Sequence, residues 1–254
     1  MKYVRSFLCA ISMFTIIPMP QYDWDMAHGS RMTACLGFAG ALLGLLSLLI
    51  SKFLTLLSVP ALIFSVLFVA AAYLLTGFLH LDGFMDVCDA LLSHRDEADR
   101  RRILKDPHCG SFAVICLVLA LSANLASVYV LRTAESLPAM AAVIVCIPIL
   151  SRVLSGLLLL CIKTMPNSSL GAYFKTGCSF AVIAVLAATG LTALAAVCFF
   201  SGLLCAVTLT AGTVLGGAAG FYATRRLGGI NGDVAGFTVV LCETAMLLGL
   251  TFLC

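Results

Sequence analysis

The sequence predicts an all-α fold: a polytopic integral membrane helical bundle of about seven transmembrane helices, plus a short N-terminal re-entrant or interfacial helix. Three observations predict it: the composition, a series of membrane-length apolar stretches, and a one-sided distribution of basic residues. Apolar residues make up 62% of the chain, charged residues 11%, and the mean hydropathy is +1.11. Soluble domains carry about 25% charged residues. We expect one integral membrane domain over residues 1–254, because no segment has a soluble domain's composition.

The N-terminal apolar run, from Phe7 to Ile17, is too short to span a bilayer, which takes about 20 residues. It ends at Pro18 and Pro20, so we expect a re-entrant or interfacial helix. The same prolines stand where a signal peptide would have a small-residue cleavage site, so we expect the segment to be retained.

Seven later stretches are near or above the length of a span, about 18 apolar residues. Two of them contain glycine clusters, over 37–44 and 216–220, which are typical of close packing between membrane helices. The seven stretches run approximately over 33–57, 60–79, 111–131, 138–162, 179–200, 203–222 and 235–253.

The basic residues gather on one side of these seven stretches. Arg132, with Lys52 near it, lies on the other side, and Arg152 lies within a span. Since loops rich in Lys and Arg stay in the cytoplasm, the rich side is predicted to be cytoplasmic. The protein is therefore expected in the cell inner (cytoplasmic) membrane, multi-pass, with the loops around 80–110 and 223–234 inside. The residues on the rich side are Lys2, Arg5, Arg31, Arg95, Arg100, Arg101, Arg102, Lys105, Lys163, Lys175, Arg225 and Arg226.

Three aspartates after the second apolar stretch are the most pointed chemical feature. Asp82, Asp86 and Asp89 are spaced i, i+4, i+7, which places them within about 60° of one helix face. Like charges on one face repel unless a cation lies between them, and Mg²⁺ prefers carboxylates together with substrate phosphates. A solvated acidic helix end is the alternative. Because the cluster adjoins lipid-length segments, where charge is costly, a Mg²⁺ site is favoured.

Two loops on the cytoplasmic side carry further candidates. Lys105 suits a phosphate, and Asp106 adds a carboxylate. In the second loop, glycines beside Arg225, Asn231 and Asp233 let backbone N–H groups approach an anion. Each segment also has a simpler interpretation. The arginine run Arg100-Arg101-Arg102, just before Lys105, could be a topology anchor that contacts lipid headgroups, and the glycine-rich segment could be a simple turn.

Two charged residues lie within predicted spans. Arg152 and Glu243 are each about 12–15 Å deep, at 1.5 Å of rise per residue. Unpaired, each would cost several kcal/mol. We expect them to pair with each other, or Arg152 to reach a substrate phosphate.

Taken together, these motifs resemble the cobalamin synthase family, adenosylcobinamide-GDP ribazoletransferase, over nearly the whole length. Ala90 and Ala113 depart from the glycines usual in that family. The motifs are Phe14-Thr15-Ile16-Ile17-Pro18-Met19-Pro20, Leu79-His80-Leu81-Asp82-Gly83-Phe84-Met85-Asp86-Val87-Cys88-Asp89-Ala90, Arg102-Ile103-Leu104-Lys105-Asp106, Gly110-Ser111-Phe112, Ser151-Arg152, Gly228-Gly229-Ile230-Asn231-Gly232-Asp233 and Glu243.

The resemblance implies transfer of the adenosylcobinamide-phosphate moiety of adenosylcobinamide-GDP to α-ribazole or its 5′-phosphate. GMP would leave, and adenosylcobalamin or its 5′-phosphate would form. Such a phosphoryl transfer needs phosphate neutralisation, basic groups and an aligned hydroxyl.

In that reading Asp82, Asp86 and Asp89 would be catalytic and hold Mg²⁺. Asp106 or Asp233 would take the hydroxyl proton, and the sequence leaves that choice open. The residues expected to bind substrate are His80, Lys105, Arg152, Arg225 and Asn231. The expected partners are these substrates and membrane lipid, with no nucleic acid, and a homo-oligomer stays open.

Two other classes compete with this reading. A phosphatidyl-type alcohol phosphotransferase also depends on Mg²⁺ and an Asp-rich membrane helix, but its Asp-x-x-Asp-Gly-x-x-Ala-Arg pattern is absent here. An ion-coupled secondary transporter would use the Asp face as an ion site. Such transporters favour sites at the bilayer midplane and inverted repeats, and the sequence shows no repeat.

Overall fold

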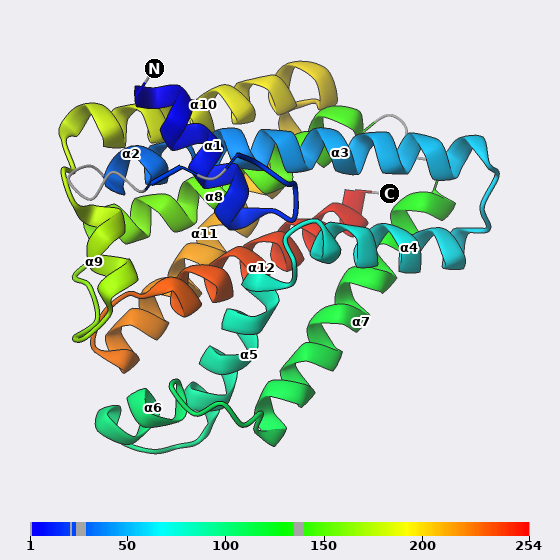
Figure 1. Ribbon diagram of the computed structural model, residues 1–254. Coiled ribbons are helices and arrows are strands. Elements are labelled where there is room, and N and C mark those ends of the chain that lie inside the picture. The colour runs from blue at the N-terminus through cyan, green and yellow to red at the C-terminus, as the bar shows by residue number, and fades with distance from the viewer. Residues whose placement is uncertain (1, 21, 24–28, 135–139, 254) are drawn as a thin grey trace.

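The computed structural model describes residues 2–20, 22–23, 29–134 and 140–253, and they form a helical bundle (Figure 1). An isolated parallel bridge between Thr164 and Ile230 joins two of the loops. The helices are α1 (Lys2–Phe14), α2 (Gly29–Ala34), α3 (Leu36–Leu56), α4 (Ala61–Leu74), α5 (Leu79–Leu92), α6 (Glu97–Ile103), α7 (Ser111–Thr133), α8 (Ala141–Cys161), α9 (Ser169–Lys175), α10 (Phe180–Ser201), α11 (Leu203–Leu227), α12 (Gly232–Leu250) and the 3₁₀ turn η2 (Thr251–Leu253).

Six helical segments of the described chain are long and apolar enough to cross a membrane. They are α2 with α3, α7, α8, α10, α11, and α12 with η2; α4 and α5 make a seventh if the two form one bent span. The polytopic bundle of about seven spans is therefore confirmed. Residues 138 and 139 of the predicted 138–162 stretch lie outside the described residues.

The stretch predicted as one span over 60–79 is broken in the structure. Helix α4 ends at Leu74, and α5 begins at Leu79 at 89° to it. Gly77 and Phe78 have left-handed backbone angles, with φ of 57° and 62°, which an α-helix cannot continue through. The prediction of a continuous helix was wrong here, because hydropathy measures apolar content and not backbone direction.

Helix α1 has 13 residues, so it is too short to span, as the sequence predicted. It ends at Phe14, and the Thr15 hydroxyl donates to the Ile11 carbonyl at 2.7 Å. The Ile16 N–H then donates to the Leu75 carbonyl at 2.9 Å, which ties the end of α1 to the α4–α5 break.

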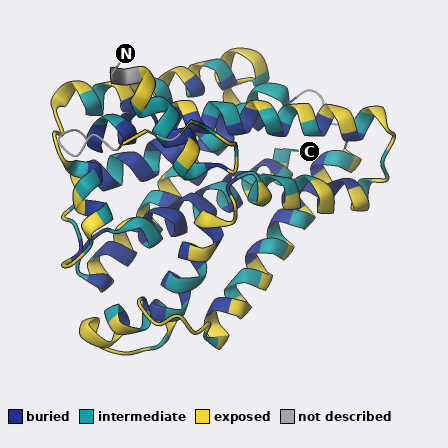
Figure 2. Cartoon of the chain, in the orientation of Figure 1, coloured by how far each residue is buried: buried dark blue, intermediate teal, exposed yellow. Residues whose placement is uncertain are grey.

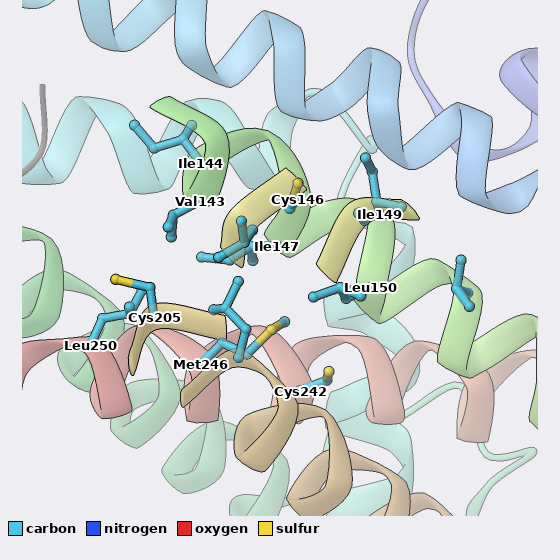
Figure 3. Close-up of a cluster of buried hydrophobic side chains, with 14 of the residues drawn as sticks. Val143, Ile144, Cys146, Ile147, Ile149, Leu150, Cys205, Cys242, Met246 and Leu250 are labelled. Atoms are coloured by element: carbon cyan, nitrogen blue, oxygen red, sulfur yellow. The ribbon is translucent and has the colours of Figure 1, made fainter. Parts of the chain in front are cut away.

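Helix α8 is the central element of the bundle. The most apolar window of α8 is 72% buried, compared with 28% for α7 and α10, and buried residues concentrate in α8 and α12 in Figure 2. Figure 3 shows Ile147 and Leu150 of α8 facing Met246 of α12. The outer helices expose large apolar side chains such as Phe199, which is 82% exposed, as lipid contact requires.

Both predicted glycine clusters lie at helix crossings. A Cβ at Gly44 would lie 2.7 Å from the Cα of Val145 in α8, and one at Gly216 would lie 2.7 Å from the Cα of Cys242 in α12. Real Cβ atoms do not come that close, so only glycine permits these backbone approaches. The predicted role of these glycines in helix packing is confirmed.

Candidate active site

The site forms where α5 crosses the beginning of α12. A Cβ at Gly83 would lie 2.8 Å from the Cα of Asp233, and one at Gly236 would lie 3.1 Å from the Cα of His80. These two glycines bring the helices close enough for side chains 150 residues apart in sequence to share one site. The local sequence around Gly83 and Gly236 does not reveal this role.

Four carboxylates gather at this crossing. Asp86 is half-buried and lies within electrostatic range of Asp82, Asp89 and Asp233. Asp233, at the first turn of α12, is also within range of Asp82. The shared face predicted from the i, i+4, i+7 spacing is therefore present, and the structure adds Asp233 to it.

Asp89 is the outlying member of this group. Its carboxylate lies against Gly110, at the start of α7, in the space that a side chain on Gly110 would occupy. In the described part of the chain, no three His, Cys, Asp or Glu side chains converge closely enough to form a metal cage by themselves.

The donor set nevertheless fits Mg²⁺. Asp86 has three acidic neighbours, so a cation would relieve the repulsion between them. Mg²⁺ usually takes one or two protein carboxylates and completes its shell with water and substrate phosphates. An open set of carboxylates suits that ion better than a closed all-protein cage would. Binding of Mg²⁺ by Asp82, Asp86 and Asp89 stays a prediction.

A cavity of about 110 Å³ lies beside Asp82. His80, Asp82, Arg152, Ser155 and Asp233 are its polar lining residues, from α5, α8 and α12. Its apolar walls come from these helices and from α1, α3 and α9: Met13, Phe14, Leu36, Leu79, Leu159, Leu170, Phe174, Gly232, Ala235 and Gly236. Five polar groups therefore converge on a small space at the acidic crossing.

Asn231, predicted to bind substrate, has two partners within its own turn. Its side-chain oxygen accepts from the Val234 N–H at 3.0 Å and so caps α12. Its side-chain nitrogen donates to the Asp233 carboxylate at 2.6 Å. The amide of Asn231 thus orients Asp233, and the role seen in the structure is one of positioning.

The glycine-rich loop before Asn231 does not present the free N–H groups that an anion cradle needs. The Gly229 N–H donates to the Thr224 carbonyl and the Ile230 N–H to the Lys163 carbonyl, both at 2.9 Å. Gly228, with φ of 77°, ends α11 as its C-cap. These three residues of the loop therefore form a turn between spans, and their N–H groups are used within the protein. The approach of the backbone at Gly232 to an anion stays a prediction.

The two other predicted phosphate ligands, Lys105 and Arg225, and the candidate base Asp106 lie on the surface. Lys105 and Asp106 are exposed between α6 and α7. The Asp106 carboxylate accepts from the His108 N–H at 3.0 Å and meets the His108 ring at 2.6 Å, and these hydrogen bonds lower the pKa of Asp106. Arg225, at the end of α11, is exposed with its guanidinium over the Phe221 ring at 4.9 Å. None of these three lines the cavity.

Arg152 and Glu243 form an ion pair, as one of the two sequence expectations had it. The Ser151 hydroxyl donates to the same Glu243 oxygen at 2.8 Å, and an Arg152 N–H donates to that hydroxyl at 2.9 Å. Arg152 is 5% exposed and also lines the cavity, so it links the acidic crossing to the interior of the bundle.

Comparison with known proteins identifies the family. The profile of the cobalamin-5-phosphate synthase family matches residues 6–251. The chain belongs to this family. Among curated proteins it is similar to the adenosylcobinamide-GDP ribazoletransferase of Clostridium perfringens strain SM101, with 36% identity over 249 residues and 97% of each chain covered.

Two further relatives carry the same name. That of Clostridium botulinum strain Eklund 17B is 34% identical over 254 residues, covering 98% of this chain and 97% of the relative. That of Geobacillus kaustophilus is 34% identical over 255 aligned positions, covering 95% and 93%. No solved structure matches the chain significantly.

The two departures from the cobalamin-5-phosphate synthase pattern are accommodated by packing. Ala90 is fully buried and Ala113 is 2% exposed. Ala90 belongs to the core of the α5–α12 half of the bundle. Each added methyl group is therefore enclosed by neighbouring side chains, at positions that present no group to the cavity.

Proposed function

We propose that this membrane enzyme transfers the adenosylcobinamide-phosphate moiety of adenosylcobinamide-GDP to α-ribazole or its 5′-phosphate. The products are GMP and adenosylcobalamin or its 5′-phosphate. The observation that carries the proposal is the meeting of Asp82 and Asp233 in one polar cavity, in a chain that belongs to the cobalamin-5-phosphate synthase family over residues 6–251.

In the reaction, the acceptor's hydroxyl oxygen forms a bond to the phosphorus attached to cobinamide. The bond from that phosphorus to the oxygen shared with GMP breaks, and GMP leaves with the electron pair. Asp233 is the proposed base for the hydroxyl proton, because it lines the cavity and Asn231 holds its carboxylate. Asp106 is the weaker candidate, because its hydrogen bonds to His108 lower its pKa and so its basicity.

The chain's remaining residues would bind and orient the substrates. Lys105 and Arg225 are exposed cations on the side of the bundle where α5 ends and α12 begins, where the diphosphate can reach them. Asp82 and Asp86, with Asp89 beside them, are proposed to hold Mg²⁺. When bound, Mg²⁺ would neutralise phosphate charge as the leaving group departs.

The direct test measures GMP release by purified protein in detergent or nanodiscs, given adenosylcobinamide-GDP and α-ribazole. We expect release that requires both substrates, stops on addition of EDTA and returns with Mg²⁺. A phosphatidyl-type transferase or an ion-coupled transporter would release no GMP under these conditions. Release that persists unchanged after exhaustive chelation would rule out the metal while leaving the transfer in place.

The broken α4–α5 span does not by itself separate an enzyme from a transporter. Discontinuous helices also build ion sites in secondary transporters. The family match over nearly the whole chain favours the enzyme.

We further propose that the site faces the cytoplasm. The twelve basic residues of the rich side lie before α3, between α5 and α7, between α8 and α10, or in the last turn of α11. The positive-inside rule places that side in the cytoplasm. The cobinamide substrate carries a nucleotide, and nucleotides are found in the cytoplasm, which supports a site on the cytoplasmic side.

Single cysteines in an otherwise cysteine-free variant test this orientation. Asp99→Cys and Arg226→Cys, both at exposed positions, should react with a membrane-impermeant maleimide only from the cytoplasmic side. Ala134→Cys, at the end of α7, should react only from outside. External labelling at position 99 would overturn the orientation.

A further inference from the structure

We infer that the cavity at the α5–α12 crossing is the subsite for the sugar of the acceptor nucleoside, and that a sugar hydroxyl, not a phosphate, occupies it. The inference rests on the proposed function and adds the place of one substrate. It follows from the size of the cavity, its charge and its unsatisfied hydrogen-bonding groups.

The size of the cavity excludes the larger parts of both substrates. A cavity of about 150 Å³ holds one benzene ring, so a cavity of about 110 Å³ has room for a group of that size or smaller. A corrin ring or a guanosine cannot enter such a space. A phosphoryl group or the hydroxyl-bearing edge of a ribose can.

The charge of the cavity separates these two remaining occupants. Asp82 and Asp233 line it, and the charge of its one cationic lining residue, Arg152, is already compensated by Glu243. Even with Mg²⁺ held at Asp82, a phosphate inside the cavity would lie against the Asp233 carboxylate, the proposed base, which is unfavourable, whereas the acceptor hydroxyl has to reach that base. Sugar hydroxyls are neutral and can donate hydrogen bonds to both carboxylates.

A buried hydrogen-bonding group points to the same class of ligand. His80 is 7% exposed and lines the cavity, and its Nδ1 has no hydrogen-bond partner among the described residues. A buried ring nitrogen without a partner is costly, and a hydroxyl can serve it as donor or as acceptor. Ser155, 5% exposed, offers a second neutral partner from α8.

The surroundings hold His80 in place for this contact. Its ring lies 6.3 Å from the Phe14 ring, which in turn lies 5.9 Å from Phe174. Both aromatic residues line the cavity, one from the end of α1 and the other from α9. The short N-terminal helix thus closes the cavity on one side, a role that its sequence does not reveal.

Gly232 provides a test that leaves the fold intact. It lines the cavity, and a Cβ added there would meet only the Leu170 side chain, at an ordinary 3.8 Å. Gly232→Ala therefore adds one methyl group at the cavity without a clash, and alanine is the better residue for a helical first turn. Ser155→Ala is the second variant, since it removes a hydroxyl that lines the cavity from α8. Ser122→Ala, at an exposed position on α7, is its control.

The readout is the initial rate of GMP release, measured while each substrate is varied with the other saturating. We expect Gly232→Ala to raise the KM for α-ribazole about 10-fold, since one methyl group in a tight subsite costs that much, and to change the KM for adenosylcobinamide-GDP less than about twofold. Ser155→Ala should raise the same KM, and Ser122→Ala should change neither.

A rise in the KM for adenosylcobinamide-GDP alone would assign the cavity to the phosphate and overturn the inference, while the proposed function would stand. Unchanged constants in both variants would also overturn it. Absence of GMP release from the unmodified protein would remove the proposed function, and the inference with it.

Discussion

Asp82→Asn and Asp86→Asn should each lower kcat/KM for GMP release by about 10²–10³, the usual cost of removing a group that stabilises charge in a transition state. Asn keeps the shape of Asp and removes its charge, so membrane insertion should be unaffected. Asp89 lies against Gly110 at the edge of the cluster. Asp89→Asn should therefore cost less, about 10–100-fold, as is typical of groups that support metal ligands.

A stability measurement separates a cation site from a merely structural cluster. Asp86 lies among three other carboxylates, so Asp86→Asn should raise the melting midpoint in EDTA by relieving repulsion. Mg²⁺ should raise the midpoint of the unmodified protein by binding its folded state, and this gain should vanish in the variant. Loss of activity with an unchanged response to Mg²⁺ would mean that Asp86 acts on substrate directly.

Asp99→Ala is the matched control. It removes an acidic residue from exposed α6, on the same side of the bundle, and should leave turnover within about twofold, as surface substitutions usually do. Near-normal turnover from two of the three cluster variants at ordinary Mg²⁺ would show that the acidic face is not the catalytic centre.

Much of this arrangement could be predicted from local sequence pattern. Apolar length and glycine spacing predicted the spans and their close crossings, because both act within one or two helices. The 3.6-residue period placed Asp82, Asp86 and Asp89 on one face for the same reason. The energetic cost of a charge deep in a span predicted that Arg152 and Glu243 each need a partner, and their mutual pairing was one of the two expectations.

The parts that sequence could not supply depend on contacts between distant segments. Asp233 joins the acidic face only because Gly83 and Gly236 allow α5 and α12 to cross closely. Nothing in either local pattern specifies that pairing. The break between α4 and α5 was missed because hydropathy is blind to the left-handed angles at Gly77 and Phe78.

The residue type of Asn231 did not reveal its structural role, and its predicted contact with substrate stays a prediction. An Asn in a glycine-rich loop beside cations has the chemistry of a ligand, and the same chemistry suits a helix N-cap. Only the folded structure shows that Asn231 makes both hydrogen bonds, to the Val234 N–H and to the Asp233 carboxylate.

The second large effect is expected for the intramembrane ion pair. Arg152→Met or Glu243→Gln alone should destabilise the protein by about 3–5 kcal/mol, because each leaves an uncompensated buried charge. At about 2–4 °C per kcal/mol for a chain of this size, the melting midpoint in detergent should fall by about 6–20 °C. The double variant should recover part of that loss, since no unpaired charge remains.

Thermal unfolding of the four proteins in one detergent, at one scan rate, measures the coupling. Lys52→Met is the control, because Lys52 is exposed on α3 and its loss should change stability by about 0.5 kcal/mol at most. Strictly additive losses would mean that the two charges do not stabilise each other. In the double variant, the cavity keeps Asp82 and Asp233 but loses Arg152 from its lining. The kcat of the double variant should therefore fall less than that of Asp82→Asn. Arg152 only lines the cavity, whereas the carboxylates are the proposed metal ligands and base.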